Sequence, residues 1–372
     1  MKTILRTFVG CTAILFGTAC MGAVKYVPEN MKVELSLKVP GNNAVNYKLH
    51  PDKLENSYFD YEWRSDNKLP ITVFHKVEER DSCMRLTVQL TAAQDVYFNY
   101  RQLLSTGYRH DNCQFYMPGF WYRRNLRSPK KAPSFHTSDS WLVREDRLSA
   151  PLTGIFSEKE KRFMTVNRLD DFSMDALATH KEGEIILSGK TSLGFTGFEN
   201  QQGIAMLSFG FPYREAPKSY IRKLTLAPEV EAFQLMKKGE SVLLTWEIME
   251  SGADDFSDFI QHTWEHCYDT YAPKPVENSY SIADMKQVLS CFFVNSLVDN
   301  QPLVYNSGIH LKVSDCERNG QAEVGFIGRV LLNAFNAWEY GWQSNREELK
   351  VNSTKIFDSY LKNGFTQAGF FK

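Results

Sequence analysis

The stretch Met31-Lys-Val-Glu-Leu-Ser-Leu-Lys-Val39 alternates apolar and polar residues along almost its whole length. Because successive side chains of a strand point to opposite faces of a sheet, this period of two predicts a strand with one face buried. Clusters of Gly, Asn, Asp and Pro separate it from similar runs downstream. Those runs are Met84–Leu90, Phe163–Val166, Glu184–Ser188, Ile204–Phe209 and Ser241–Ile248.

The runs between Val24 and Glu250 follow one another without an intervening amphipathic helix. Strands joined without crossover helices indicate an antiparallel sandwich and argue against a parallel α/β sheet. We therefore expect an antiparallel β-sandwich domain over residues 24–250.

Helical periodicity replaces the alternation near Asp254. Residues 251–280 predict a helical linker, which Pro273 and Pro275 end. Its apolar stripe consists of Phe256, Phe259, Ile260, Trp264 and Cys267.

Three more helices are expected in residues 281–372. They cover Ser281–Leu297, Glu323–Tyr340 and a last helix opened by Ser344-Asn-Arg-Glu347, which has the pattern of a capping box. The helix Glu323–Tyr340 has the cleanest apolar stripe, and Gly341 follows it as a C-terminal stop signal.

Three segments of this helical region carry a resemblance to a known architecture: Gly325-Phe-Ile-Gly-Arg329, Glu339-Tyr-Gly341 and Ile356–Phe365. Together they resemble the opening of the (α/α)6 toroid found in large secreted bacterial glycoside hydrolases and polysaccharide lyases. In several of those enzymes an N-terminal β-sandwich precedes the toroid, joined by a helical linker. The resemblance implies a multidomain β + α fold, with residues 281–372 as the start of a toroid.

The same resemblance implies a function in polysaccharide degradation. A toroid of about twelve helices needs on the order of 300 residues, whereas only 100 residues follow Ala272. We therefore expect a truncated toroid and the N-terminal portion of a secreted bacterial polysaccharide-degrading enzyme, inactive alone. A non-catalytic glycan-binding or scaffold lipoprotein, complete as written, is the alternative.

The amino-acid composition limits the classes of molecule that the protein is expected to bind. The 43 Lys and Arg against 44 Asp and Glu leave a net charge of −1, which argues against nucleic-acid binding by a basic face. Aromatic residues make up 13% of the chain, a surplus that suits stacking on sugar rings. The expected partner is therefore a polysaccharide or oligosaccharide, and no cofactor is expected.

The N-terminal sequence predicts an export signal. A basic start precedes the apolar run Phe8–Phe16 and a small-residue exit that ends at Cys20. Lipidation of Cys20 or ordinary cleavage near Ala19 or Ala23 would complete it. We expect export from a bacterium, to the periplasm or as an outer-membrane lipoprotein, with the lipid anchor as the only membrane contact.

The cysteines do not form a disulfide framework, because five at wide spacings remain after Cys11 and Cys20. A Cys83–Cys113 disulfide is one alternative, and buried free thiols are the expected state.

The loop Phe115–Arg127 is the main candidate binding site. It places aromatic rings, which stack on pyranose faces, beside arginines, which grip uronate carboxylates. We expect it to bind an acidic oligosaccharide through Trp121, Tyr122, Arg123 and Arg124.

Other candidates are weaker. Secondary glycan-contacting candidates are Trp141, Asp146, Arg147, Glu323 and Arg329, and the catalytic residues themselves are not assigned. The segment His262-Thr-Trp-Glu-His266 fits the H-x-x-E-H zinc pattern, but no clear glutamate-bearing helix follows to complete it. We therefore predict no metal site.

Overall fold

The computed structural model divides into two compact units, Met1–Pro273 and Lys274–Lys372. The candidate signal segment with Cys20, and the candidates Glu323 and Arg329, lie outside the described residues. None of the helices in the described ranges is long and apolar enough to span a membrane. The described ranges are 27–54, 60–80, 83–128, 132–170, 182–222, 225–295, 297–298, 303–305, 309–311, 316–318 and 330–369.

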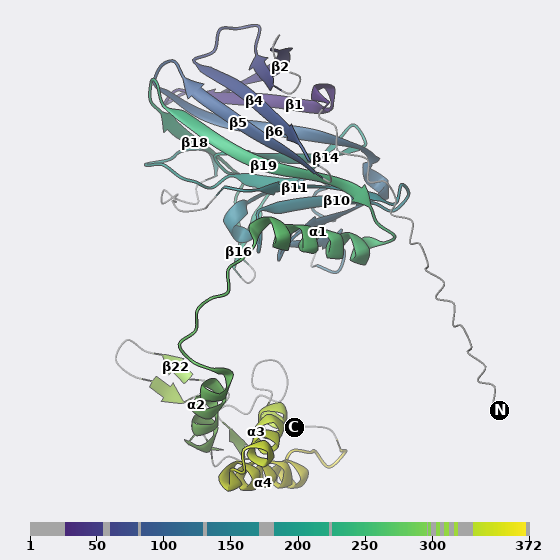
Figure 1. Ribbon diagram of the computed structural model, residues 1–372, viewed down its shortest axis with the longest axis vertical. Helices are drawn as coiled ribbons and strands as arrows, with labels where there is room; N and C mark the ends of the chain where they lie inside the picture. The colour runs from purple at the N-terminus through teal and green to yellow at the C-terminus, as the bar shows by residue number, and fades with distance from the viewer. Residues whose placement is uncertain are drawn as a thin grey trace, which may run out of the picture. The chain divides into compact units, whose positions relative to one another are not determined.

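The first unit is an antiparallel β-sandwich (Figure 1). One layer is centred on β6, a long strand that pairs with β1, β14 and β18. In this layer β14 also pairs with β13, and β13 with β9. Its strands are β1 (Met31–Lys38), β6 (Val96–Arg109), β9 (Trp141–Arg144), β13 (Phe195–Gln201), β14 (Ile204–Phe211) and β18 (Val230–Met236).

The second layer is a continuous antiparallel ladder from β3 through β4, β5, β19, β11, β10 and β7 to β8. Strand β2 (Val45–Lys53) joins the layers, because its first half pairs with β1 and its second half with β3. The layer consists of β3 (Asp60–Arg64), β4 (Ile71–Glu79), β5 (Cys83–Ala92), β7 (Cys113–Met117), β8 (Trp121–Arg123), β10 (Leu152–Ser157), β11 (Arg162–Arg168) and β19 (Ser241–Gly252).

Short elements complete this unit. Strand β12 is parallel to β18, whereas the other pairs described are antiparallel. These elements are β12 (Gly183–Ile186), β15 (Arg214–Glu215), β16 (Ser219–Arg222), β17 (Thr225–Ala227) and the 3-10 turns η1 (Pro28–Asn30), η2 (His110–Asn112) and η3 (Glu145–Arg147).

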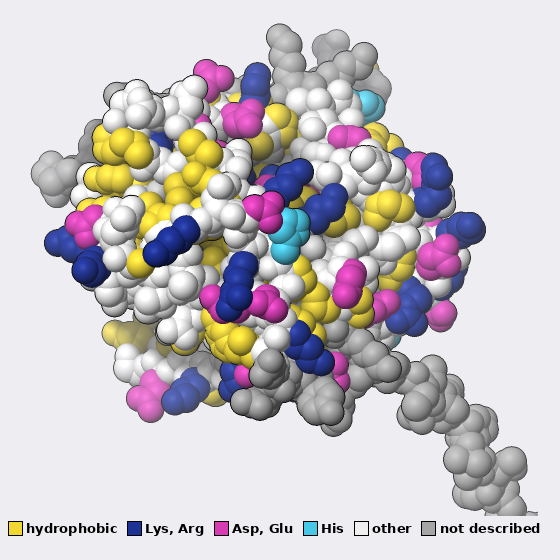
Figure 2. Space-filling view, turned by 90° about the horizontal axis from the view of Figure 1, so that it is seen from above, with side chains coloured by type: hydrophobic (Ala, Val, Ile, Leu, Met, Phe, Trp, Pro, Cys, Tyr) yellow, Lys and Arg dark blue, Asp and Glu magenta, His cyan; other side chains and the backbone are white. Residues whose placement is uncertain are grey.

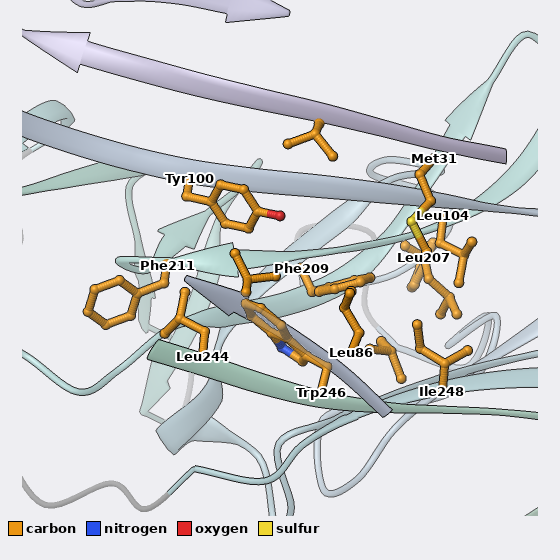
Figure 3. Close-up of a cluster of buried hydrophobic side chains, with 14 of the residues drawn as sticks. Met31, Leu86, Tyr100, Leu104, Leu207, Phe209, Phe211, Leu244, Trp246 and Ile248 are labelled. Atoms are coloured by element: carbon orange, nitrogen blue, oxygen red, sulfur yellow. The ribbon is translucent and has the colours of Figure 1, made fainter. Parts of the chain in front are cut away.

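The main core lies between the two layers (Figure 3). Tyr100 on β6 and Phe209 on β14 face Leu86 on β5 and Trp246 on β19, and all four side chains are buried. The Phe209 and Trp246 rings lie 5.1 Å apart between centroids. The alternating residues of the predicted strands thus form the contact between the layers.

Helix α1 (Phe256–Tyr271) covers the outer side of β10, β11 and β19 (Figure 1). Its N-cap is Asp255, whose carboxylate accepts hydrogen bonds from the backbone N–H groups of Ser257 and Asp258. Phe259 anchors the helix, because its fully buried ring packs on Phe156 and Phe163, with centroids 6.0 and 4.9 Å away.

The second unit corrects the predicted fold class. Among its described residues it contains three helices and two short β pairs, and these do not form the opening of an (α/α)6 toroid. Between α2 and α3 the described residues form two short strand pairs. The elements are α2 (Ile282–Asn295), β20 (Leu297–Val298), β21 (Val304–Tyr305), β22 (Ile309–Leu311), β23 (Cys316–Arg318), α3 (Val330–Gln343) and α4 (Glu347–Asn363).

A small core holds this unit together. Tyr305 on β21 packs against Phe293 of α2, with ring centroids 5.1 Å apart, and its hydroxyl lies 3.2 Å from the Ser353 hydroxyl of α4. The predicted capping box is wrong: Ser344 donates its hydroxyl to the Tyr340 carbonyl at the end of α3, and α4 has Arg346 at its N-cap.

The expected buried free thiols are confirmed for three cysteines, and Cys291 differs because it is exposed. Cys83, Cys113 and Cys267 are buried and free, and Cys291 is exposed and free. The alternative Cys83–Cys113 disulfide is therefore wrong.

Candidate functional site

A groove of about 870 Å³ lies along the loop that was predicted to bind glycans. The loop follows β7 and contains the short strand β8, at the end of the second layer. The groove is lined by Gln114, Tyr122, Arg123, Arg124, Asn125, Leu126, Arg127 and Ser128.

Asn125 fixes the shape of this loop. Its backbone N–H donates to the Tyr122 carbonyl, while its side-chain oxygen accepts from the Tyr122 N–H, both at 3.0 Å. Its amide nitrogen donates to the carbonyls of Phe120 and Pro133 at 3.2 Å. Asn125 has a positive φ of 49°, a conformation that Asn tolerates better than most residues.

Arg124 is a structural residue of the groove wall. Its guanidinium donates to the backbone carbonyls of Cys113 and Asp111 and lies over the Phe135 ring, 4.9 Å from the centroid. Its hydrogen-bonding capacity is therefore partly used within the protein, and its main effect is to tie the loop to β7.

Arg123, Arg127 and Tyr122 are exposed in the groove, as is the apolar side chain of Leu126. Tyr122 is 51% exposed, and both arginines are exposed. Arg123 lies over the Phe256 ring, 5.0 Å from its centroid, which shields one face of the guanidinium. Within the described ranges no salt bridge joins Arg123 or Arg127 to a carboxylate. Two cations and one aromatic face thus border the same groove.

Trp121 and Trp141 lie in the sandwich core. Both are completely buried, with ring centroids 5.4 Å apart, and Phe198 packs on Trp121 at 5.2 Å. The indole N–H of Trp121 donates to the Arg123 carbonyl, and that of Trp141 to the Ser138 carbonyl. Neither ring has a face open to a sugar, so these two candidates support the loop from beneath.

Asp146 and Arg147 are held in ion pairs away from this groove. The Asp146 carboxylate accepts two hydrogen bonds from Arg144, and Arg147 makes a bidentate pair with the buried Glu215. Their neighbour Glu145 is fully buried, and burial raises the pKa of its carboxyl although Arg168 donates to it at 2.8 Å.

The structure also contains a charged pocket that the sequence analysis missed. It has a volume of about 490 Å³. Because its residues come from separate parts of the chain, no local sequence motif predicts the pocket. Arg101 bridges Glu34 and Glu199, and Arg214 pairs with Glu231 at 2.8 Å. Burial lowers the pKa of Arg214, whereas for Arg101 the two carboxylates outweigh burial and raise the pKa.

The histidines of the H-x-x-E-H segment do not face a common site. The partly exposed His262 is 3.4 Å from the Asp258 carboxylate one turn earlier on α1, while His266 is 2.7 Å from Glu247 on β19. The paired-histidine arrangement of that zinc motif is therefore not formed.

Surface charge elsewhere is mixed. On the face shown in Figure 2, Lys and Arg side chains are interspersed with Asp and Glu and do not gather into one basic field. The described part of the loop, residues 121–128, is different, because it carries Arg123, Arg124 and Arg127 and no acidic residue.

Comparisons with known proteins yield weak structural similarity. No family model and no curated protein matches the chain. Among solved structures, a polysaccharide lyase is 11% identical with a TM-score of 0.31, covering 90% of this chain and 54% of its own. The GH36 α-galactosidase AgaA from Geobacillus stearothermophilus is 11% identical with a TM-score of 0.33, covering 59% and 30%.

A galactose mutarotase related enzyme from Lactobacillus acidophilus is 10% identical with a TM-score of 0.31, and the match covers 59% of this chain and 79% of that one. The chain spans about half the length of the polysaccharide lyase and less than a third of AgaA. These neighbours are carbohydrate-active by name, and at this level of similarity they assign no activity to the chain.

Proposed function

We propose that the sandwich unit binds an acidic oligosaccharide in the groove beside β8. The observation that carries the proposal is the placement of Tyr122, Arg123 and Arg127 along one groove of about 870 Å³. An aromatic ring supplies an apolar face for a pyranose, and a guanidinium fork pairs with the carboxylate of a uronic acid. The loop is fixed by Asn125 and Arg124, so little ordering is needed on binding.

The groove supports recognition rather than glycosidic hydrolysis. Hydrolysis needs two carboxyl groups that flank the scissile bond, and none of the described residues that line the groove is acidic. We propose that the chain serves as the glycan-recognising part of a secreted polysaccharide-degrading protein. A non-catalytic glycan-binding lipoprotein is the alternative, and the same groove would serve it.

We also propose that the protein is exported, because the polysaccharides in question lie outside the cytoplasm. The basic start, the apolar run Phe8–Phe16 and Cys20 support secretion with a lipid on that cysteine.

The test is calorimetric titration of the full chain with an oligouronate and with a neutral oligosaccharide of equal length. We expect the oligouronate alone to bind, and Arg123→Gln and Tyr122→Ala each to weaken it by about 1 kcal/mol, roughly fivefold. Arg64→Gln is the matched control, because Arg64 is also exposed and lies on β3.

A second control separates sugar recognition from charge alone. Polyglutamate carries carboxylates without pyranose rings, so it should not compete with the oligouronate at equal charge. Equal binding of neutral and acidic sugars, equal affinity of the groove variants and wild type, or full competition by polyglutamate would contradict the proposal.

A further inference from the structure

Three side chains from three elements converge beneath α1. Cys83 begins β5, Glu247 lies on β19 and His266 lies on α1. In the antiparallel register Cys83 is opposite Met249 and Arg85 is opposite Glu247, so Cys83 and Glu247 are diagonal neighbours on one face of the sheet. This is the face that α1 covers.

The cluster is compact and largely enclosed. The Sγ of Cys83, a carboxylate oxygen of Glu247 and a ring nitrogen of His266 all lie within 4.8 Å of one another. Cys83 and Glu247 are buried, at 4% and 3% exposure, and the His266 side chain is 22% exposed. The His266 Nε2 is 2.7 Å from Glu247 Oε1, and the Thr270 hydroxyl donates to the same oxygen at 3.0 Å.

We propose that Cys83, Glu247 and His266 bind a zinc ion. Thiolate, imidazole and carboxylate are the three ligand types that zinc takes in proteins, and their mixture disfavours magnesium and calcium, which require oxygen ligands. Three protein ligands leave a fourth tetrahedral position for water. On binding, the Cys83 thiol releases its proton to solvent, and the thiolate and carboxylate cancel the charge of the ion.

The His266–Glu247 pair requires a small adjustment, and the Cys83 Sγ lies within 4.8 Å of both other ligand atoms, against about 3.6 Å in a tetrahedral zinc site. Two ligand atoms of a tetrahedral zinc site stand about 3.3 Å apart, so His266 and Glu247 need to separate by roughly half an ångström. Arg85, whose guanidinium is 3.7 Å from the other Glu247 oxygen, orients that carboxylate from outside the cluster. The hydrogen-bonded cluster alone, without metal, is the competing account, and it makes opposite predictions for every measurement below.

The experiment measures metal binding on the full chain. Zinc bound per chain is determined by equilibrium dialysis and mass spectrometry, and cobalt(II) is used as a coloured substitute. We expect one tight zinc site, a cobalt–thiolate charge-transfer band, and a melting temperature that rises with zinc concentration. Cys83→Ala should abolish the band, and His266→Gln should weaken zinc binding by at least about tenfold.

Matched variants make the result decisive. His262→Gln changes the neighbouring histidine of the same helix, and Cys113→Ala changes another buried thiol of the sandwich, so both should bind zinc as the wild type does. The proposal is overturned if the wild type binds no zinc, if the band persists in Cys83→Ala, or if His266→Gln binds zinc with unchanged affinity. Circular dichroism of each variant confirms that loss of metal is not loss of folding.

Discussion

Trp121 and Tyr122 are adjacent in the sequence, yet one ring is enclosed by the core and the other is half exposed. Trp121→Ala should therefore lower the free energy of unfolding by about 3–5 kcal/mol, because it leaves a cavity beside Trp141 and Phe198. Urea denaturation followed by fluorescence measures the change.

Tyr122→Ala is the companion variant, since the same loop loses a ring that packs only partly. Its stability should stay within about 1 kcal/mol of the wild type. If Trp121→Ala were as stable as Tyr122→Ala, the core position of the tryptophan would be wrong.

The sequence predicted the residue types of this loop better than the orientation of its side chains. Aromatic and basic residues do line a groove there, but β8 has only three residues, too few for alternation to show that Trp121 points inward and Tyr122 outward. The structural role of Arg124 could not be predicted from the sequence either. Its hydrogen-bond partners are backbone carbonyls, which every residue has.

The close contact between β10 and α1 allows the position of the helix to be tested directly. A Cβ added at Gly154 would lie 2.5 Å from the Phe259 ring and 3.1 Å from the Thr165 methyl group. Gly154→Ala should therefore destabilise the protein by about 1–3 kcal/mol through overpacking.

A double-mutant cycle attributes that cost to the helix. In a Phe259→Leu background, which removes the opposing ring edge, the cost of Gly154→Ala should fall by at least about 0.5–1 kcal/mol. Equal costs in both backgrounds would show that α1 does not press on β10 as the structure has it.

Strands with a sustained apolar pattern could be predicted from the sequence. Helix ends, where neighbouring backbone groups compete for the same side chain, could not. The runs Met31–Val39, Met84–Leu90, Ile204–Phe209 and Ser241–Ile248 became β1, β5, β14 and β19. In β1 and β5 one buried face imposes the alternation, whereas β14 is a mostly apolar run that is buried on both faces. The capping box failed because Ser344 satisfies the end of α3 instead, and sequence alone cannot decide between two neighbouring helix ends.

The resemblance of three helical segments to a toroid predicted the wrong fold for the second unit. The helices of the second unit have the periodicity of toroid hairpins, but periodicity reports one buried face and not the partner that buries it. Here Val304 and Tyr305 on β21 share that core with α3 and α4. The charged pocket and the Cys83–Glu247–His266 cluster escaped prediction for a related reason, since each joins residues far apart in the chain.

The segment between the two units is exposed to solvent. Residues 272–281 form neither helix nor strand and are exposed throughout, and Val276 is 91% exposed. Exposed, irregular backbone is the preferred substrate of proteases, whereas glutamates within the strands are protected by the sheet. A glutamate-specific protease should therefore cut the folded chain first after Glu277.

Because the groove and the proposed zinc cluster both lie before Pro273, the sandwich fragment released by this cut should keep them. We expect it to retain the oligouronate affinity of the full chain within about twofold and to unfold cooperatively, since it has a core of its own. Glu277→Gln, which removes the cleavage site, should protect the full chain under the same conditions. A fragment that unfolds on release, or that binds the sugar many-fold more weakly, would show that the first unit depends on residues beyond it for its fold or its groove.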